Sequence, residues 1–317
     1  MIKAAAEFLK KYNIEEKTVL AAVSGGVDSS VLLFILNELK EEFKLDIKVV
    51  HLNHNWRGRE SFDDMEFVKS FAKDLGLEFY FETLEDDIKK TELSAREARY
   101  EFFERALKKF DSNICFLAHN KNDNVETLLY RIIKGTGVLG LSSIPVVRKP
   151  FYRPLLNFSR EQIENFACEN QIEFRVDSSN DDTKYKRNFI RQKILPEILK
   201  INDCALDSIG SLINIAAEHN EIMEDYLAIV EKEVFDLNCK DFTHNRPLII
   251  RDKFLSLKPA LQREIISRYF KGLLKNRDNK NILKIQNFII ENEASTLSIN
   301  KDTFLKSWKN GVFLYKK

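Results

Sequence analysis

The residues most capable of chemistry in this sequence form one short turn, residues 24–30, that follows an apolar run at 17–23. Two adjacent glycines allow the backbone to turn tightly and to approach a ligand closely. A helix predicted directly after the turn points its free amides and the positive end of its dipole back at it. The pattern therefore predicts a phosphate-binding loop rather than an ordinary helix cap. Its members are Ser24, Gly25, Gly26, Val27, Asp28, Ser29 and Ser30.

One member of this loop, Asp28, carries a negative charge where phosphates are expected. A carboxylate beside phosphates is repulsive unless a cation lies between them. The loop contains neither G-x-x-x-x-G-K-S/T nor G-x-G-x-x-G, so two common nucleotide motifs are excluded. We therefore predict ATP with Mg²⁺ as the ligand, and we predict that Asp28 contacts the metal.

The elements that must position this loop alternate between strand and helix over the first half of the chain. This order predicts an α/β fold, a parallel sheet with helices on both faces, whose ligands bind at the carboxyl ends of the strands. Beyond residue 150 the pattern becomes mainly helical, with a break near Pro196, and the last segment predicts a smaller mixed α/β domain. The predicted strands are 17–23, 46–52, 77–84 and 113–117, and the predicted helices are 28–39, 61–75, 94–110 and 123–134.

Polar residues follow the second and fourth predicted strands, at the edge where ligands of a parallel sheet bind. His51, Asn53, His54 and Arg57 come at the end of the second strand, and His119 comes at the end of the fourth. A solvated polar loop is the alternative interpretation of the first group.

Charged pairs at helical spacing form a further set of candidates. Asp123 and Glu126 lie one turn apart at a predicted helix start, where the helix dipole also favours carboxylates as simple caps. Arginine pairs could bind phosphate through two parallel hydrogen bonds, or could merely be solvated. These pairs are Arg96 with Arg99 and Arg187 with Arg191.

The charge of the chain is distributed unevenly. Residues 245–317 hold 16 Lys and Arg against 6 Asp and Glu, a local charge of +10, whereas the whole chain carries +1. Such asymmetry favours contact with a polyanion, and a solvated lysine-rich surface is the alternative.

Cysteine placement and hydropathy exclude other classes of protein. The four cysteines, at positions 115, 168, 204 and 239, include no C-x-x-C pair, which argues against a zinc ribbon, an iron–sulfur site or a local redox pair. We read no apolar stretch of about 18 residues and no signal peptide, so we predict no membrane span and a cytoplasmic location.

Taken together, the motifs resemble those of the PP-loop ATP pyrophosphatases, and within them the tRNA(Ile)-lysidine synthetase family. The resemblance covers about residues 17 to 195. Besides the loop and the strand-end residues, it rests on Ser94-Ala95-Arg96-Glu97-Ala98-Arg99-Tyr100, Lys134-Gly135-Thr136-Gly137, Arg153-Pro154-Leu155, Asp177-Ser178-Ser179-Asn180 and Arg187-Asn188-Phe189-Ile190-Arg191.

The resemblance implies a reaction. ATP activates C2 of the wobble cytidine in the CAU anticodon of tRNA(Ile), pyrophosphate leaves, and the ε-amine of free lysine then displaces AMP to give lysidine. It also implies three regions: a catalytic PP-loop domain at 1–200, a helical linker at 201–244 and a basic tRNA-docking domain at 245–317. A monomer and a homodimer both remain open.

The resemblance assigns roles to individual residues. One departure concerns the family pattern H-H-x-D-D-Q-x-E-T, because this chain has Asn122 in place of the first Asp. Any role that needs a carboxylate there must fall to Asp123, Glu126 or a residue elsewhere. The implied catalytic residues are Asp28, His119, Asp123, Glu126 and Arg191. ATP binding falls to residues 24–30 and His51, and contact with the tRNA or other substrate falls to Asn53, His54, Arg57, Arg96, Arg99, Arg153, Lys186 and Arg187.

Three other functions compete with this interpretation. A related tRNA thiolase would need cysteines for sulfur transfer or a cluster, and an amidating synthetase would not need the basic C-terminal region. A non-catalytic RNA-binding protein would explain the charge asymmetry but not the Ser-Gly-Gly-x-Asp-Ser loop.

Overall fold

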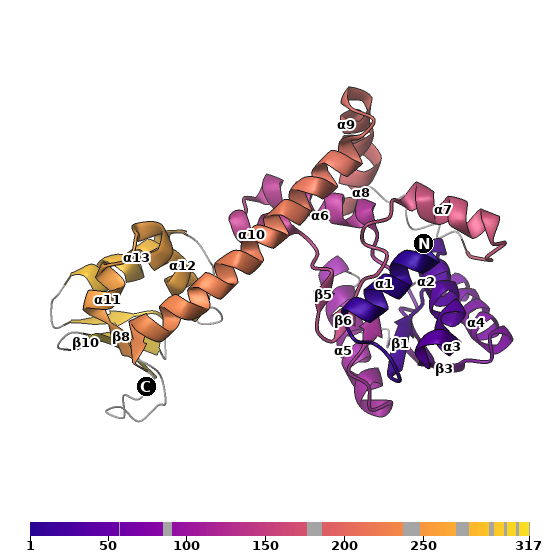
Figure 1. Ribbon diagram of the computed structural model, residues 1–317, viewed down its shortest axis with the longest axis horizontal. Helices are drawn as coiled ribbons and strands as arrows, with labels where there is room; N and C mark the ends of the chain where they lie inside the picture. Colours follow the sequence, from indigo (N-terminus) through magenta and orange to yellow (C-terminus); the bar gives the residue numbers. More distant parts are fainter. Residues whose placement is uncertain are drawn as a thin grey trace. The chain divides into compact units, whose positions relative to one another are not determined.

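The computed structural model describes residues 1–56, 58–84, 91–175, 186–236, 248–270, 279–291, 295–300, 303–308 and 311–316. The chain divides into two compact units, Met1–Glu218 and His219–Lys317, and the division falls inside one long helix. Figure 1 shows the two units and labels most of their elements.

The N-terminal unit is built around a six-stranded sheet of order β3-β2-β1-β4-β6-β5. Neighbouring strands are parallel except for the β5–β6 pair at one edge. The parallel sheet predicted from the alternation of apolar runs is confirmed. The strands are β1 (Thr18–Ala22), β2 (Asp46–Asn53), β3 (Glu78–Thr83), β4 (Cys115–Phe116), β5 (Val147–Arg148) and β6 (Phe151–Tyr152).

Helices cover both faces of this sheet, because successive residues of β1 point to opposite sides. Val19 and Ala21 join one apolar core with helices α1, α2, α3, α4 and α7, whereas Leu20 joins a second core with α5. The helices are α1 (Ile2–Lys11), α2 (Val27–Glu38), α3 (Lys40–Phe43), α4 (Arg59–Asp74), α5 (Glu92–Lys109), α6 (Lys121–Lys134) and α7 (Arg160–Glu169).

Three helices begin two residues before their predicted starts: α4 at Arg59, α5 at Glu92 and α6 at Lys121. α4 begins after Gly58 rather than at Ser61, and α5 is capped by Thr91, whose side chain accepts from the Ser94 amide. Ser94, the predicted first residue of this helix, is therefore its third residue, because Thr91 offers the capping hydroxyl one turn earlier. Ser159 and Gln162 form a capping box at the start of α7.

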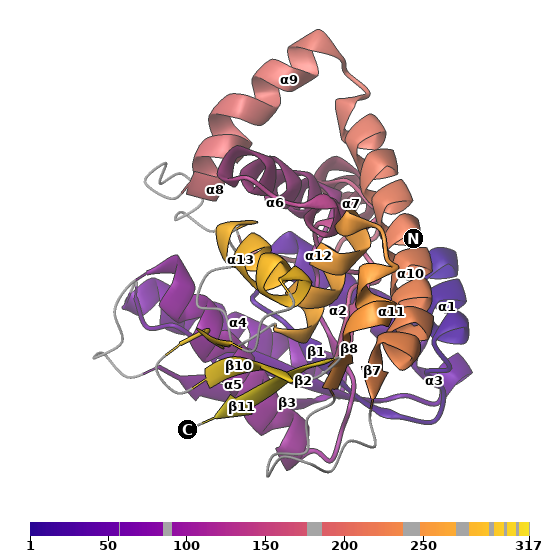
Figure 2. The same cartoon turned by 90° about the vertical axis from the view of Figure 1, so that its left-hand side faces the viewer.

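A continuous helical rod carries Arg191. It consists of α8 (Lys186–Phe189), a π-helical turn η3 (Ile190–Ile194) and α9 (Leu195–Ile201), and the chain reverses after it into α10 (Ala205–Val234) (Figure 2). The predicted break at Pro196 is therefore wrong. Proline lacks an N–H and its ring crowds the carbonyl four residues earlier, and the preceding turn widens to π geometry without ending the helix.

The rod packs against helix α6 of the N-terminal unit through a small apolar cluster. Val125 and Leu128 of α6 contact Leu195 of α9 and Ile213 of α10. Lys121 of α6 also forms an ion pair with Asp207 of α10, at 2.6 Å. The short helix η1 (Val138–Ser142) contributes Leu141 to the same cluster.

The C-terminal unit has its own core and an antiparallel five-stranded sheet of order β7-β8-β11-β10-β9. The predicted smaller mixed α/β fold is confirmed. Its elements besides the end of α10 are β7 (Phe235–Asp236), β8 (Leu248–Ile250), α11 (Arg251–Leu255), α12 (Pro259–Tyr269), α13 (Asn279–Ile290), β9 (Thr296–Ser298), β10 (Thr303–Trp308) and β11 (Gly311–Lys316).

Within the described parts of the chain, no helix combines the length and the apolar character that crossing a membrane requires.

Candidate active site

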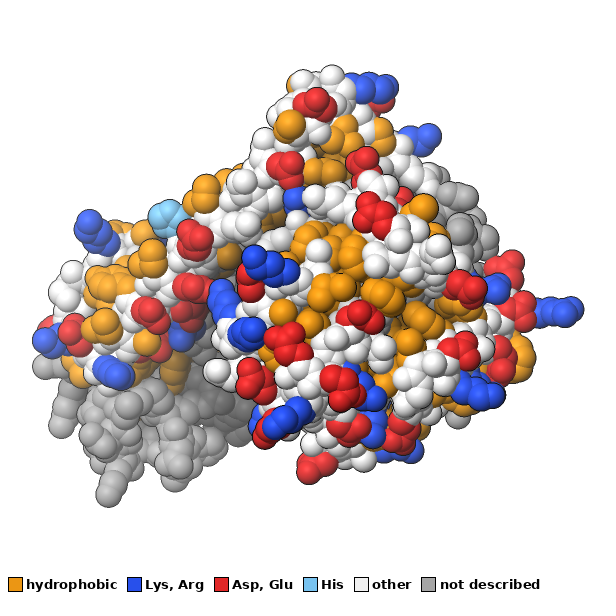
Figure 3. Space-filling model, turned by 45° about the vertical axis from the view of Figure 1, so that its right-hand side comes forward, with side chains coloured by type: hydrophobic (Ala, Val, Ile, Leu, Met, Phe, Trp, Pro, Cys, Tyr) orange, Lys and Arg blue, Asp and Glu red, His pale blue; other side chains and the backbone are white. Residues whose placement is uncertain are grey.

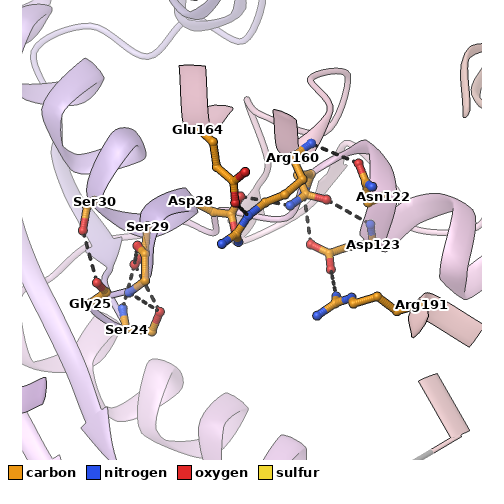
Figure 4. Close-up of polar contacts among 12 residues, drawn as sticks. Ser24, Gly25, Asp28, Ser29, Ser30, Asn122, Asp123, Arg160, Glu164 and Arg191 are labelled. Atoms are coloured by element: carbon orange, nitrogen blue, oxygen red, sulfur yellow. Dashed lines mark hydrogen bonds and ion pairs between the residues drawn. The ribbon is translucent and has the colours of Figure 1, made fainter. Parts of the chain in front are cut away.

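The predicted phosphate loop joins β1 to α2 and closes on itself through Ser29. The Ser29 hydroxyl donates to the Gly26 carbonyl at 2.9 Å, and its oxygen accepts from the Ser24 amide at 3.1 Å (Figure 4). Gly25 has φ +96°, a conformation that residues with a side chain rarely adopt. Sequence and local geometry therefore agree on a tight turn that only glycine supports without strain.

The start of α2 fits a phosphate group. Gly26 is its N-cap, and among the described residues no side chain caps the helix. The first amides of a helix lack intrahelical acceptors, so they can bind an anion. The side chains of Ser29 and Ser30 are buried and support the turn: the Ser30 hydroxyl lies 3.5 Å from the Gly25 carbonyl.

Asp28 lies in the first turn of α2, and each of its carboxylate oxygens accepts a hydrogen bond from a neighbouring side chain. Asn120 Nδ2 donates to Oδ1 at 3.0 Å, and Arg160 Nη1 donates to Oδ2 at 2.5 Å (Figure 4). Burial raises the pKa of the Asp28 carboxyl above its usual value, and Arg160 and Asn120 offset only part of that rise. The β1 and β4 ends thus converge as the parallel topology requires, because Asn120 follows β4.

Asp28 also fits a magnesium ion. In the described part of the chain, no group of three or more His, Cys, Asp or Glu side chains is arranged to hold a metal. Mg²⁺ needs no such group, since it takes one or two carboxylates and completes its shell with phosphate and water oxygens. The Asp28 side chain is 21% exposed beside the loop, and Mg²⁺ there would neutralise its charge against phosphates.

A second arginine, Arg191, binds the carboxylates of Glu126 and Asp123. Arg191 Nε and Nη2 donate to the two oxygens of Glu126 at 2.7 and 3.0 Å, and Nη2 also donates to Asp123 Oδ1 at 3.1 Å. Burial raises the pKa of Glu126, against the opposing effect of Arg191. The structure thus brings together three of the candidate catalytic residues, although the sequence analysis gave Arg191 a phosphate partner and not these carboxylates.

Asp123 serves as a cap and as a site residue at once. Its Oδ2 accepts from the Asn120 amide at 3.1 Å, so the capping that the sequence left open is present. Its other oxygen faces Arg191. The Asp123 side chain is 27% exposed, whereas that of Glu126 is 3% exposed, so Asp123 is the carboxylate that a substrate can reach.

Asn122 has a positioning role that the sequence did not suggest. Its Oδ1 accepts from the backbone amide of Arg160 at 3.0 Å, which caps the first turn of α7 from the neighbouring helix α6. An acceptor at a helix N-terminus needs no charge, so an amide can replace the usual carboxylate here.

His119 lies just after β4, near four arginine side chains. Its Nδ1 accepts from Arg153 Nε at 3.3 Å, which leaves the ring proton on Nε2. Burial, followed by the positive charges of four arginines, lowers the pKa of His119 to about 3. The imidazole is therefore neutral at physiological pH. The arginines are Arg153, Arg99, Arg96 and Arg187.

These arginines occupy different environments. Arg153 is buried and donates to the Pro145 carbonyl at 3.0 Å, so it is part of the wall of the site. Arg96 is exposed and lies over the Tyr100 ring, 5.1 Å from its centre, and Arg99 and Lys186 are exposed as well. Figure 3 shows acidic and basic side chains interspersed on another face of the N-terminal unit, with no large area of one sign.

The remaining predicted residues lie at the end of β2. His51 is buried and its Nδ1 donates to the Val23 carbonyl at 2.8 Å, which supports the strand end just before the loop. Asn53 is buried and accepts from the Asn55 amide, and the His54 ring lies 5.5 Å from that of Trp56. Arg57 and the 177–180 motif lie outside the described residues.

Sequence reasoning missed Arg160 and Asn120. The capping box of α7 identifies Arg160 as the first residue of a helix, but its contact with Asp28 spans 132 positions and has no local signal. Asn120 has a weak signal, since it precedes Asp123 by three residues in capping-box spacing.

The fold and this loop define a PP-loop protein, and a family model described as "PP-loop domain" matches residues 1–198. Three similar curated proteins are named tRNA(Ile)-lysidine synthase. The Clostridium tetani protein is 33% identical over 93% of this chain and 64% of its own length, and the Caldanaerobacter subterraneus protein is 33% identical over 100% and 70%. The Thermotoga maritima protein is 32% identical over 93% and 73%. The chain belongs to the tRNA(Ile)-lysidine synthase family of PP-loop proteins.

The similarity covers only part of the longer relatives, and a solved structure shares the fold. The chain spans 64% of the length of the Clostridium tetani relative. Among solved structures, the U34-tRNA thiolase NcsA of Methanococcus maripaludis matches with a TM-score of 0.57 and 16% identity, over 69% of this chain and 78% of that chain. That likeness concerns the fold alone.

Proposed function

We propose that this protein ligates free lysine to C2 of the wobble cytidine in the CAU anticodon of tRNA(Ile). The cytidine O2 attacks the α-phosphorus of ATP, an O–P bond forms, and pyrophosphate leaves. The lysine ε-amine then attacks C2, the C2–O2 bond breaks, and AMP departs with the oxygen. The product is lysidine.

One observation carries the proposal. The three relatives named tRNA(Ile)-lysidine synthase align with 93% to 100% of this chain, including its C-terminal unit, and not with the PP-loop domain alone. The site geometry supports it, because a phosphate-binding loop faces paired carboxylates across the ends of β1 and β4.

The residues divide the work in this proposal. The loop amides hold the phosphates of ATP, and Asp28 serves Mg²⁺. Arg191 keeps Glu126 ionised and in place, and Asp123 receives the lysine amine, since it is the more accessible carboxylate. His51 supports the loop beside the nucleotide, and neutral His119 offers an Nε2 proton as a hydrogen-bond donor to an oxygen of the substrate.

We also propose a role for each region. Residues 1–200 form the catalytic domain, 201–244 act as a helical linker, and 245–317 dock the tRNA through their local charge of +10. On the catalytic domain, Asn53, His54, Arg57, Arg96, Arg99, Arg153, Lys186 and Arg187 are the candidate contacts with tRNA or other substrate. The reaction would take place in the cytoplasm.

The related thiolase activity finds less support. Cys115 is buried, Cys168 and Cys204 are exposed on separate elements, and no described group of cysteines gathers at the site.

Pyrophosphate release distinguishes the proposed enzyme from a non-catalytic RNA-binding protein. We expect release when tRNA(Ile) with a CAU anticodon, ATP and lysine are all present. No release under these conditions would reject the proposed activity.

A further inference from the structure

The guanidinium of Arg160 bridges two carboxylates in the ligand-free protein. Its Nη1 lies 2.5 Å from Asp28 Oδ2, and its Nε lies 2.7 Å from Glu164 Oε1 (Figure 4). The Arg160 side chain is 41% exposed and the Asp28 side chain is 21% exposed. The ion pair therefore lies at the solvent side of the site, where a side chain can leave at low cost.

This ion pair occupies the position that a cation on Asp28 requires. Asn120 already holds Oδ1, and Arg160 holds Oδ2. A guanidinium and a divalent cation on one carboxylate would lie within a few ångströms of each other, where like charges repel strongly. A cation that binds Asp28 must therefore displace Arg160.

The backbone of Arg160 is fixed at the helix start, whereas its half-exposed side chain is held by the two ion pairs with Asp28 and Glu164. Asn122 Oδ1 accepts from the Arg160 amide at 3.0 Å, and the Ser159–Gln162 capping box fixes the same helix start. The displaced guanidinium thus remains within reach of the loop at the start of α2. Guanidinium groups bind phosphate oxygens through paired hydrogen bonds, so phosphates on that loop are its natural new partner.

We propose that Arg160 is a placeholder for the metal at Asp28 and becomes a ligand of the ATP phosphates once the metal displaces it. This inference rests on the ATP-dependent function proposed above. Mg²⁺ alone must break the Asp28–Arg160 pair without compensation, whereas Mg²⁺ with ATP supplies a new partner for the arginine. Binding of metal and nucleotide is therefore positively coupled through one side chain.

The test measures binding to the full chain by titration calorimetry, with Mg²⁺ alone and with ATP in the presence of Mg²⁺. Replacing Arg160→Ala removes the competitor, so Mg²⁺ alone should bind about tenfold more tightly than to wild type. The same variant should bind ATP with Mg²⁺ about tenfold more weakly, because a charge-assisted contact is lost. Arg160→Lys keeps a positive charge beside Asp28 and should leave the affinity for Mg²⁺ alone near wild type.

A matched control comes from Arg105 of α5, which forms a similar partly exposed ion pair with Glu82 of β3 at 2.6 Å. Arg105→Ala should change neither affinity. Unchanged or weaker binding of Mg²⁺ alone in Arg160→Ala, or unchanged binding of ATP with Mg²⁺, would overturn the proposal while leaving the proposed function intact. A wild-type chain that binds no ATP would contradict both proposals.

Discussion

Arg191 holds the carboxylate of Glu126 with two parallel hydrogen bonds, Nε to Oε1 at 2.7 Å and Nη2 to Oε2 at 3.0 Å. The glutamate side chain is 3% exposed, so its charge has little access to water and depends on this arginine. The arginine comes from a π-helical turn, a helix irregularity that often occurs at functional sites. The pair joins two segments 65 residues apart and fixes one side of the candidate site.

Removal of this arginine should destabilise the protein strongly. Arg191→Ala leaves the buried Glu126 without its cation, and breaking such a pair costs about 3 kcal/mol. Urea unfolding at pH 7 measures the loss. The double variant Arg191→Ala with Glu126→Gln removes the orphaned charge and should recover part of the stability. Equal stability of the single and double variants would show that the arginine does not act through Glu126.

Asp28→Asn should separate activity from stability. We expect adenylation, followed as pyrophosphate release, to fall about 100-fold or more, because the charge that serves the metal is gone. Stability should change in the opposite sense. Burial raises the pKa of Asp28, so the wild type loses stability as pH rises from the ordinary pKa of 3.8 through the raised pKa in the folded protein.

The asparagine variant does not ionise, so its Tm should exceed that of the wild type at pH 7. The difference should vanish below the unfolded-state value of 3.8, where both side chains are neutral. A lower Tm at pH 7, or a pH-independent difference, would contradict the assignment of burial as the dominant cause.

Neighbouring residues on α6 should respond differently to substitution. Asp123→Asn should abolish product, because the accessible carboxylate is lost. Asn122→Asp should keep activity near wild type, since an aspartate accepts the same hydrogen bond from the Arg160 amide. Asn122→Ala should retain measurable activity but weaken ATP binding, because the Arg160 amide loses the acceptor that helps to fix the start of α7. Lysidine formation and ATP affinity check the ranking, and a more damaging effect at Asn122 than at Asp123 would reverse it.

Much of this site was predictable from local signals, and its central contacts were not. The Gly25–Gly26 turn, the strands around it and the carboxylates at the start of α6 follow from short-range patterns. Arg160 reaches Asp28 across 132 positions, and only the order of the strands brings α7 beside α2. Asn122 could be recognised as an amide, but not as the cap of another helix.

The predicted start of a helix was wrong where two residues could each serve as its cap. Thr91 and Ser94 both offer a hydroxyl, and the chain uses the earlier one as the cap of α5. At Pro196, local propensity favours a break, whereas packing of Leu195 against Val125 and Leu128 favours a continuous rod. These tertiary contacts keep the helix continuous through Pro196, and the π turn before it accommodates the proline ring.

The basic C-terminal region should set the salt dependence of tRNA binding. Neutralising four exposed lysines of the C-terminal unit (Lys253, Lys258, Lys280 and Lys284 to Gln) should reduce the slope of log affinity against log salt by up to about 0.9 for each lost phosphate contact. The control neutralises four exposed lysines of the N-terminal unit, Lys3, Lys17, Lys73 and Lys108. Equal slopes for both quadruple variants would reduce the C-terminal charge to a solvated surface.

Mass spectrometry of the nucleosides of tRNA(Ile) with a CAU anticodon tests directly whether the protein joins lysine to the wobble cytidine. The tRNA is incubated with the full chain, ATP, Mg²⁺ and lysine, and then digested. We expect a cytidine heavier by one lysine minus one water, formed only when ATP and lysine are both present and lost in Asp28→Asn. An unmodified cytidine with the wild-type chain, or a thiolated nucleoside in its place, would contradict it.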